Sequence, residues 1–335
     1  MKSRKNLVIA SFAALILAAG AVIAVAAAPK MTGIAYVAGH GGHLAVLNLA
    51  NGELDRINVT PPAGLNAEGK PNPIVGTHGQ VLKGRDLYIG LLNGKIMKYN
   101  LDSGELKELA QHGKKLCGAV TGPDGNIYFE DMADGNVYVF DPVKDKPSDV
   151  IPVGKSLCGI GWDKSGRYAF VTDMIQGNVY VLDMKTKRTI KTIEDVGIFL
   201  HQSRTTPDKS ELWVTAANEF KQTDDKKDPW ATAGKGKSEI VIIDTEKMTI
   251  KERFATEEGI YPHDLAFTPD GKYALLTART YGDDSVLVVY DMKTKETLSE
   301  TSLCKSCHDA AGVKVTIDKG SPLLCGIEVD WSAKK

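Results

Sequence analysis

The sequence lacks any imbalance of charge, and it is poor in cysteine. Its 41 lysines and arginines face 42 aspartates and glutamates, which leaves a formal net charge of −1. Without an excess of positive charge, nothing in the composition supports nucleic-acid binding or attachment to an anionic membrane surface. Only five of the 335 residues are cysteines, so a spaced cysteine motif is less expected by chance than in a cysteine-rich chain. The length allows one large domain or two ordinary ones, and 43% hydrophobic residues suffice for a substantial core.

The first 28 residues differ in composition from the rest. A basic start is followed by an apolar run from Leu7 to Ala28, and Ala24-Val25-Ala26 offers a small-residue cleavage site. The pattern predicts a signal peptide over residues 1–28. Because the run of about 22 residues exceeds a typical signal-peptide core, an uncleaved membrane anchor is the alternative. Either way we expect the rest of the chain to be exported, to the periplasm or another extracytoplasmic compartment.

After the leader, the chain repeats one pattern of short strands and tight turns. The stretch KKLCGAVTGPDGNIYFEDMADGNVYVFDP (114–142) matches KSLCGIGWDKSGRYAFVTDMIQGNVYVLDM (155–184), and similar units follow. Runs of β-branched and aromatic residues bounded by Gly, Asp, Asn and Pro are typical of strands and turns. A period of roughly 40 residues is that of a four-stranded propeller blade. We name the four strands of a blade A to D, from the inside outward.

The two ends of the chain complete each other in this scheme. The segment GIAYVAGHGGHLAVLNLANGELDRINV supplies strands B, C and D without A, whereas LLCGIEVDWSAKK near the C-terminus supplies a strand A with nothing after it. The sequence therefore predicts an all-β fold, with a single β-propeller domain over residues 31–335. Six blades are expected, or seven if an irregular blade has been missed, and the terminal strands should pair within one blade so that no sheet edge stays open.

The repeated units carry a family resemblance. The form PDG followed by two strands and a terminal V-x-V-(I/L)-D recurs over Pro123–Asp141 and Pro269–Asp291. In this respect the chain resembles the YVTN-type β-propeller family and, more distantly, the haem d1 propeller of cytochrome cd1 nitrite reductase. The resemblance covers nearly all of residues 33–335. It implies a propeller fold and does not settle function, because propellers serve as enzymes, scaffolds and binding modules.

A cysteine motif lies in the last connection of the predicted ring. In CKSCH, Cys304 and Cys307 are spaced to bond the vinyl groups of a haem, and His308 is placed to ligate its iron. Long D-to-A and B-to-C connections gather on one rim of the propeller, which predicts a binding face. We therefore expect one covalent haem c on a loop over residues 301–321. A surface disulfide or a small metal site is the alternative interpretation.

The second ligand of such a haem is left open by the sequence. His40 and His43, in AGHGGH, are the nearest histidine candidates, and Met132 and Met174 occupy the same kind of B-to-C loop in the third and fourth blades. A thioether ligand would raise the reduction potential relative to a histidine.

The starts of the A strands form a second regularity. Aligned by their A-to-B turns, the six units place a histidine or a cysteine there in every case: His78, Cys117, Cys158, His201, His263 and Cys325. Imidazole and thiolate together suit zinc or copper, so three or four neighbours, with or without His308, are candidate ligands of a metal or of haem iron. Alternatively, the cysteines are small buried apolar residues and the histidines bond loop backbone.

A disulfide between Cys117 and Cys158 is a third interpretation of this ring. It requires Cα atoms within roughly 7 Å of each other. We place it below the other two, because the starts of adjacent inner strands are expected to stand farther apart.

Three functional hypotheses follow. The first is a c-type haem protein that transfers electrons or oxidises or reduces a small molecule at the channel mouth. The second is a non-catalytic propeller subunit that organises a larger redox complex. The third is a metal-dependent propeller enzyme that uses His78, His201 and His263, with CKSCH as a metal clip. The expected partners are a small-molecule substrate or a redox protein, and no nucleic acid.

Overall fold

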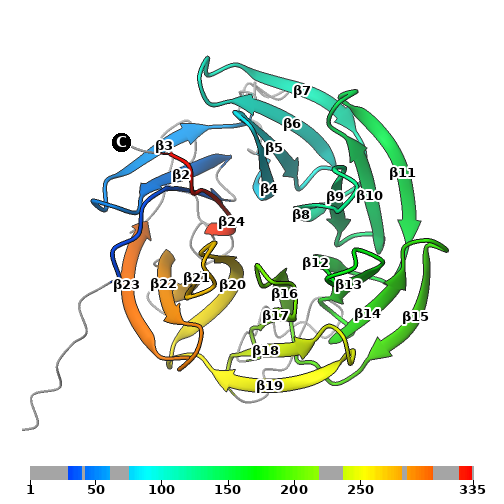
Figure 1. Ribbon diagram of the computed structural model, residues 1–335. Coiled ribbons are helices and arrows are strands. Elements are labelled where there is room, and N and C mark those ends of the chain that lie inside the picture. The colour runs from blue at the N-terminus through cyan, green and yellow to red at the C-terminus, as the bar shows by residue number, and fades with distance from the viewer. Residues whose placement is uncertain are drawn as a thin grey trace, which may run out of the picture.

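The computed structural model describes residues 29–39, 42–60, 75–218, 237–280, 285–304 and 324–333. Six four-stranded antiparallel sheets stand around a common axis as the blades of a β-propeller (Figure 1). The predicted all-β fold and the count of six blades are confirmed. No described residue lies in a helix, and the described part of the chain accordingly holds no helix long and apolar enough for a membrane crossing. The predicted signal peptide or anchor lies outside the described residues.

Each blade runs from an innermost strand at the axis to an outermost strand at the periphery. From the inside outward, blade 1 consists of β24 (Leu324–Asp330), β1 (Ile34–Gly39), β2 (His43–Asn48) and β3 (Leu54–Asn58). Blade 2 consists of β4 (Thr77–Lys83), β5 (Asp86–Leu91), β6 (Lys95–Asn100) and β7 (Leu106–Gln111). Blade 3 consists of β8 (Leu116–Thr121), β9 (Ile127–Asp131), β10 (Asn136–Asp141) and β11 (Lys146–Pro152).

The remaining three blades follow the same order. Blade 4 consists of β12 (Leu157–Trp162), β13 (Tyr168–Asp173), β14 (Asn178–Asp183) and β15 (Arg188–Ile193). Blade 5 consists of β16 (Leu200–Thr205), β17 (Glu211–Ala216), β18 (Glu239–Asp244) and β19 (Thr249–Ala255). Blade 6 consists of β20 (Ile260–Phe267), β21 (Tyr273–Thr280), β22 (Ser285–Asp291) and β23 (Thr297–Cys304).

Blade 1 joins the two ends of the chain, as the sequence predicts. The C-terminal β24 pairs antiparallel with the N-terminal β1, with Tyr36 opposite Glu328 and Ile34 opposite Asp330. The ring is therefore closed by backbone hydrogen bonds and exposes no unpaired edge at the closure. Gln80 of blade 2 strengthens the seam, because its side-chain amide donates to the carbonyls of Tyr36 (2.8 Å) and Gly326 (3.0 Å).

The repeated sequence pattern explains the repeated blade. In β10 and β14 the sequences NVYVFD and NVYVLD begin with the same burial alternation, whereas the outer strands β11 and β15 are mostly exposed. Each third strand of blades 3 to 6 ends in an aspartate whose carboxylate accepts backbone N–H groups of the following turn, and these are Asp141, Asp183, Asp244 and Asp291. Their expected role in turn formation is confirmed.

Candidate functional site

The six histidines and cysteines predicted at the starts of the inner strands meet at the centre of the ring. They come from β4, β8, β12, β16, β20 and β24, and none has more than 5% of its surface exposed: His78, Cys117, Cys158, His201, His263 and Cys325. Two chemically different parts share this ring. The disulfide arc is Cys117 and Cys158 of blades 3 and 4. The histidine arc is His201, His263, Cys325 and His78 of the consecutive blades 5, 6, 1 and 2.

The disulfide arc corrects an expectation from the sequence. Cys117 and Cys158 form a disulfide with their Cα atoms 5.0 Å apart. The expectation that adjacent inner strands stand too far apart for this bond was wrong. In the oxidised form neither sulfur is a thiolate, so the predicted metal-ligand role of these two cysteines does not apply to the disulfide.

Glycine explains why the inner strands approach so closely. A Cβ atom added at Gly79 would stand 2.5 Å from the carbonyl carbon of Gly118, and one added at Gly159 would stand 2.4 Å from the amide nitrogen of Ser203. Backbone of the neighbouring blade occupies the space that a side chain would need. A glycine after the ring residue therefore sets the short distance between neighbouring blades.

An apolar cluster covers the disulfide arc. Met132 and Met174 pack with the two cysteines, together with Phe199 and Ala217, and the methionines are 7% and 2% exposed. Both methionines follow the second strand of their blade and lie at the rim predicted to carry the binding loops. Their packing is that of core residues.

The histidine arc brings imidazole rings within contact distance. The ring centroids of His201 and His263 are 3.9 Å apart, and the ring of His78 is stacked on that of His201 at 5.9 Å. One ligand atom each of His78, His263 and Cys325 lies within 4.8 Å of the other two, and the same holds for His78, Cys158 and His201. The three histidines predicted as candidate ligands are thus brought together.

Three threonines fix the backbone of the histidine arc. The hydroxyls of Thr172, Thr215 and Thr277, each on the second strand of a blade, donate to a carbonyl of the next blade. The acceptors are the carbonyls of His201 (3.2 Å), His263 (2.7 Å) and Cys325 (2.6 Å). These contacts were not predicted from the sequence, although aligning the VTD, VTA and LTA triplets of the second strands would reveal them.

Blade 3 has Glu130 in place of that threonine. Glu130 precedes Asp131 at the end of β9 as Thr172 precedes Asp173 at the end of β13. The side chain is 1% exposed and lies against β8, since a Cβ at Gly118 would stand within contact of a Glu130 carboxylate oxygen. Burial raises the pKa of Glu130 to about 8, and the nearby Arg204 guanidinium offsets only part of this. Glu130 therefore keeps its proton at neutral pH.

A buried ion pair lies further along the inner strands, next to the histidine arc. The Arg204 guanidinium donates to both oxygens of the fully buried Asp264 carboxylate, at 3.0 and 2.8 Å, and to the carbonyl of Ala119. Asp264 also accepts the backbone N–H of Ile327 at 2.9 Å. This carboxylate therefore ties blades 5, 6 and 1 together.

Two further buried groups near this ion pair have raised pKa values. Burial raises the pKa of Glu328 to about 7, against the opposing field of Arg204. Burial raises the pKa of the Cys325 thiol well above its usual range, and the negative charge of Asp264 acts in the same direction. The centre of the ring thus holds two carboxyl groups that carry protons near neutral pH.

Several predicted haem-site residues fall at or beyond the edge of the described chain. Cys304 is the last residue of β23, where its backbone pairs with Ser285. Cys307, His308 and His40 lie outside the described residues. His43 begins β2 and is 2% exposed, so it is buried at the rim where the second strands end.

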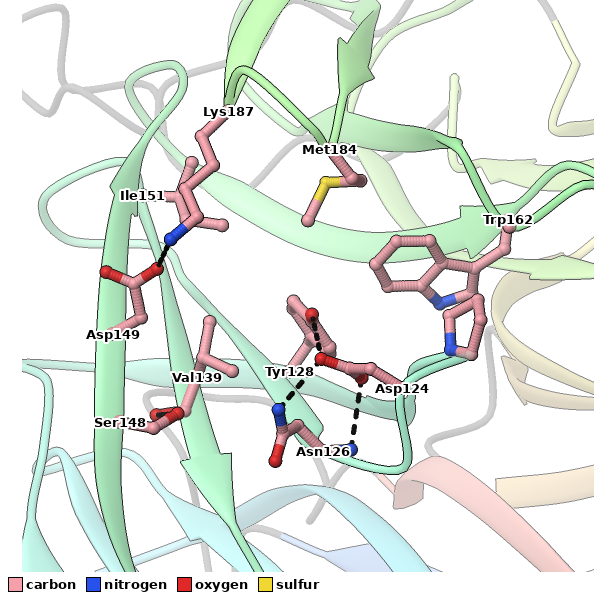
Figure 2. Close-up of a pocket in the computed structure, with 12 residues that line it drawn as sticks. Asp124, Asn126, Tyr128, Val139, Ser148, Asp149, Ile151, Trp162, Met184 and Lys187 are labelled. Atoms are coloured by element: carbon pink, nitrogen blue, oxygen red, sulfur yellow. Dashed lines mark hydrogen bonds and ion pairs between the residues drawn. The ribbon is translucent and has the colours of Figure 1, made fainter.

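A pocket of about 590 Å³ offers a contrasting candidate between blades 3 and 4 (Figure 2). It is lined by first-to-second and third-to-fourth strand turns, so it opens on the face opposite the ring residues. Its polar groups serve these turns, because Tyr128 and Asn126 donate to Asp124, and Lys187 pairs with Asp149. Trp162 packs edge-on against Tyr128 at 4.8 Å. The convergent ligands and raised pKa values favour the ring as the functional site.

Comparison with known proteins relates the chain to haem d1 propellers. A family model described as "Cytochrome D1 heme domain" matches residues 128–307, more than half of the chain. A curated relative, dihydro-heme d1 dehydrogenase of Pseudomonas aeruginosa, is 30% identical over 150 residues, which are 44% of this chain and 26% of that protein. The chain therefore matches about a quarter of that relative's length.

Two solved structures align with large parts of the chain. Kuenenia stuttgartiensis hydrazine synthase superposes with a TM-score of 0.53 at 18% identity, over 65% of this chain and 63% of that one. Dihydro-heme d1 dehydrogenase NirN in complex with DHE gives a TM-score of 0.48 at 21% identity, over 80% and 55% of the two chains.

Of the two resemblances seen in the sequence, the more distant one, to the haem d1 propeller, is therefore supported. The resemblance to YVTN-type propellers stays a prediction. With its match over residues 128–307 and its six-bladed ring, the chain belongs to the cytochrome D1 heme domain family.

Proposed function

We propose that this protein is an exported redox protein that carries a haem c on Cys304 and Cys307, with His308 as an axial ligand. The observation that carries the proposal is the position of the motif. Cys304 ends the outer strand β23, and the next described strand, β24, begins at Leu324 and contributes Cys325 to the ring. The segment with CKSCH therefore joins the outer edge of blade 6 to the centre of the propeller. Family membership supports a haem-related redox role.

The types of side chain at the rim are suited to binding a haem. Imidazole nitrogen is a common axial ligand of haem iron, and His201 of the histidine arc supplies one. Phe199 packs edge-on against His201, with ring centroids 4.9 Å apart, and gives that imidazole an apolar neighbour. When bound, the haem supplies one-electron redox chemistry.

The chain's own residues would exclude water and supply protons. The six ring residues are buried, so a reaction next to them takes place in a medium of low dielectric constant. Glu130 holds a proton on its carboxyl group up to a pKa of about 8, and Glu328 exchanges one at about 7. These two carboxyls are our candidates for the groups that balance charge when an electron arrives. The substrate is a small molecule at the rim, or the electron passes to a redox protein partner.

A place in a larger periplasmic redox complex is our second candidate function. Val143, Val150 and Ile190 are 92%, 43% and 51% exposed, and they lie on the outer parts of the neighbouring blades 3 and 4. Contact with a partner protein would bury these apolar side chains. Gel filtration of the native extract tests this candidate, and a lone monomer with full redox activity would count against it.

The intact mass and the reduced absorption spectrum test the principal proposal. The full chain is produced with the machinery that matures c-type cytochromes. We expect the mass of one covalent haem and the absence of residues 1–28, with a thioether-type haem spectrum. The Cys304→Ser/Cys307→Ser variant should lose the covalent haem, whereas Cys117→Ser/Cys158→Ser should keep it. A wild-type protein without haem would overturn the proposal.

A further inference from the structure

We propose that the histidine arc binds one transition-metal ion, copper or zinc, through His78, His263 and Cys325. This site would be a second centre, separate from the haem of the proposed function. The three residues come from β4, β20 and β24, the inner strands of three consecutive blades. One ligand atom from each lies within 4.8 Å of the other two, and all three side chains are buried.

The spacing is close to that of a metal site. Ligand atoms bound at about 2.0–2.3 Å from an ion stand roughly 3.5 Å from one another. Shifts of about 1 Å in the positions of these three ligand atoms would therefore allow all of them to bind one ion. The ring centroid of His201 is 3.9 Å from that of His263, so a further imidazole lies beside this trio.

The donor set selects the class of metal. Two imidazoles and one thiolate suit zinc, and the same trio in trigonal geometry is typical of copper in electron-transfer sites. Magnesium and calcium prefer oxygen ligands, which this trio does not offer. Cys325 differs here from the other two cysteines of the ring, whose sulfurs are joined to each other.

Contacts behind the ligands hold them in place. The Nδ1–H of His78 donates to the carbonyl of Cys117 at 2.8 Å, which leaves the lone pair of this imidazole on Nε2. Metal-bound histidines commonly donate their other ring nitrogen to a carbonyl in this way. Thr215 and Thr277 fix the backbone carbonyls of His263 and Cys325. The site thus has outer contacts of the kind that metal centres use.

Elemental analysis of the purified full chain, with its haem, tests the inference. We expect about one copper or zinc ion per chain in addition to the haem iron. Cys325→Ser and His263→Ala should each lower that copper or zinc content at least tenfold. The matched control for His263→Ala is His112→Ala, which removes an imidazole that follows the outer strand β7 and contacts Val139 and Tyr138, and which should keep the metal. Circular dichroism checks that each variant is folded.

A spectroscopic titration covers the case in which a variant does not fold. Wild-type protein stripped with a chelator is titrated with Cu²⁺, Zn²⁺ and Co²⁺ in turn. Binding of copper or cobalt should produce a thiolate-to-metal charge-transfer band, and zinc should displace the cobalt and remove the band. Copper or zinc that persists in both ligand variants would show adventitious metal only and overturn the inference.

The two proposals fail in different ways. Protein with haem that neither contains nor binds copper or zinc would refute the metal site and leave the proposed function standing. Protein that binds the metal with the thiolate band but carries no haem would refute the proposed function and leave the metal site standing.

Discussion

The disulfide arc and the histidine arc occupy equivalent positions in the six blades, yet their chemistry differs. In blades 3 and 4 the ring residues are joined to each other and covered by Met132 and Met174. In the other four blades the ring residues face one another as separate donors, and threonines of the neighbouring blades hold those of blades 5, 6 and 1. A repeat fold thus allows the same position to serve packing on one side and, in our proposal, metal binding on the other.

The charges next to the ring follow the same division. On the histidine side Asp264 is fully paired with Arg204, whereas on the disulfide side Glu130 stands in the threonine position and keeps its proton. The ion pair fixes the geometry of three blades, and the protonated carboxyl provides a titratable group. The charged bridge between blades therefore lies on the histidine side, and the protonated carboxyl lies on the disulfide side.

Loss of the buried ion pair should lower the free energy of unfolding more than any other change considered. Arg204→Met leaves the Asp264 carboxylate buried without its guanidinium, and we expect the free energy of unfolding to fall by about 3–5 kcal/mol. Arg167→Met is the control, because Arg167 pairs with Asp183 at the surface and is 56% exposed. That change should cost much less, because an exposed ion pair is screened by water and salt. Denaturant unfolding measures both, and equal costs would mean that Asp264 does not anchor the histidine side.

Removal of the disulfide should have the next largest effect. Cys117→Ser/Cys158→Ser opens a link between residues 41 apart in sequence, and we expect a loss of about 2–4 kcal/mol of unfolding free energy. The double variant should keep its haem and its ring metal. Unfolding of the wild type with and without a reductant provides the comparison. A variant as stable as the oxidised wild type would show that the disulfide arc is not a structural link.

Glu130 should make stability depend on pH. Its folded pKa of about 8 lies above the ordinary glutamate value of 4.5, so this contribution is fully present below pH 4.5 and is lost as pH rises through 8. Between pH 6 and pH 8 the free energy of unfolding should fall by roughly 2 kcal/mol. Glu130→Gln should remove this share of the pH dependence, and Glu328→Gln should remove a smaller share. A wild-type stability that rises over this interval would contradict the assignment.

A threonine contact should have the smallest effect. Thr277→Val removes the hydroxyl that donates to the Cys325 carbonyl, and we expect a cost of about 1 kcal/mol. Its weaker counterpart is Thr172→Val, whose hydroxyl reaches the His201 carbonyl at 3.2 Å. Metal titration provides the sharper measurement, because only Thr277→Val should weaken metal binding. Equal metal affinity in both variants would indicate that the threonine does not position Cys325.

The sequence predicted the fold and the ring well, because both depend on local patterns. Strand runs, turn aspartates and the incomplete end units were sufficient for six blades and for the pairing of β24 with β1. Aligning the turns placed His78, His201 and His263 at the same height, and the structure brings them together.

The contacts across blades were not predicted from the sequence. The Cys117–Cys158 disulfide depends on how closely β8 approaches β12 at Gly118, where an added Cβ would stand 3.0 Å from the Cys158 carbonyl oxygen, and the repeat pattern does not show this. The bond between Arg204 and Asp264 joins residues 60 apart in sequence, and it depends on the relative register of two blades. The raised pKa of Glu130 depends on burial, and the sequence around FED gives no sign of it.

The midpoint potential of the haem most directly tests whether the haem faces the histidine side of the ring. We compare wild type, His201→Ala, His263→Ala and Cys117→Ser/Cys158→Ser in one redox titration. We predict that both histidine variants shift the potential and the visible spectrum of the haem, while the disulfide variant leaves both close to wild type. Unchanged potentials in the histidine variants, or an equal shift in all three, would contradict this placement of the haem.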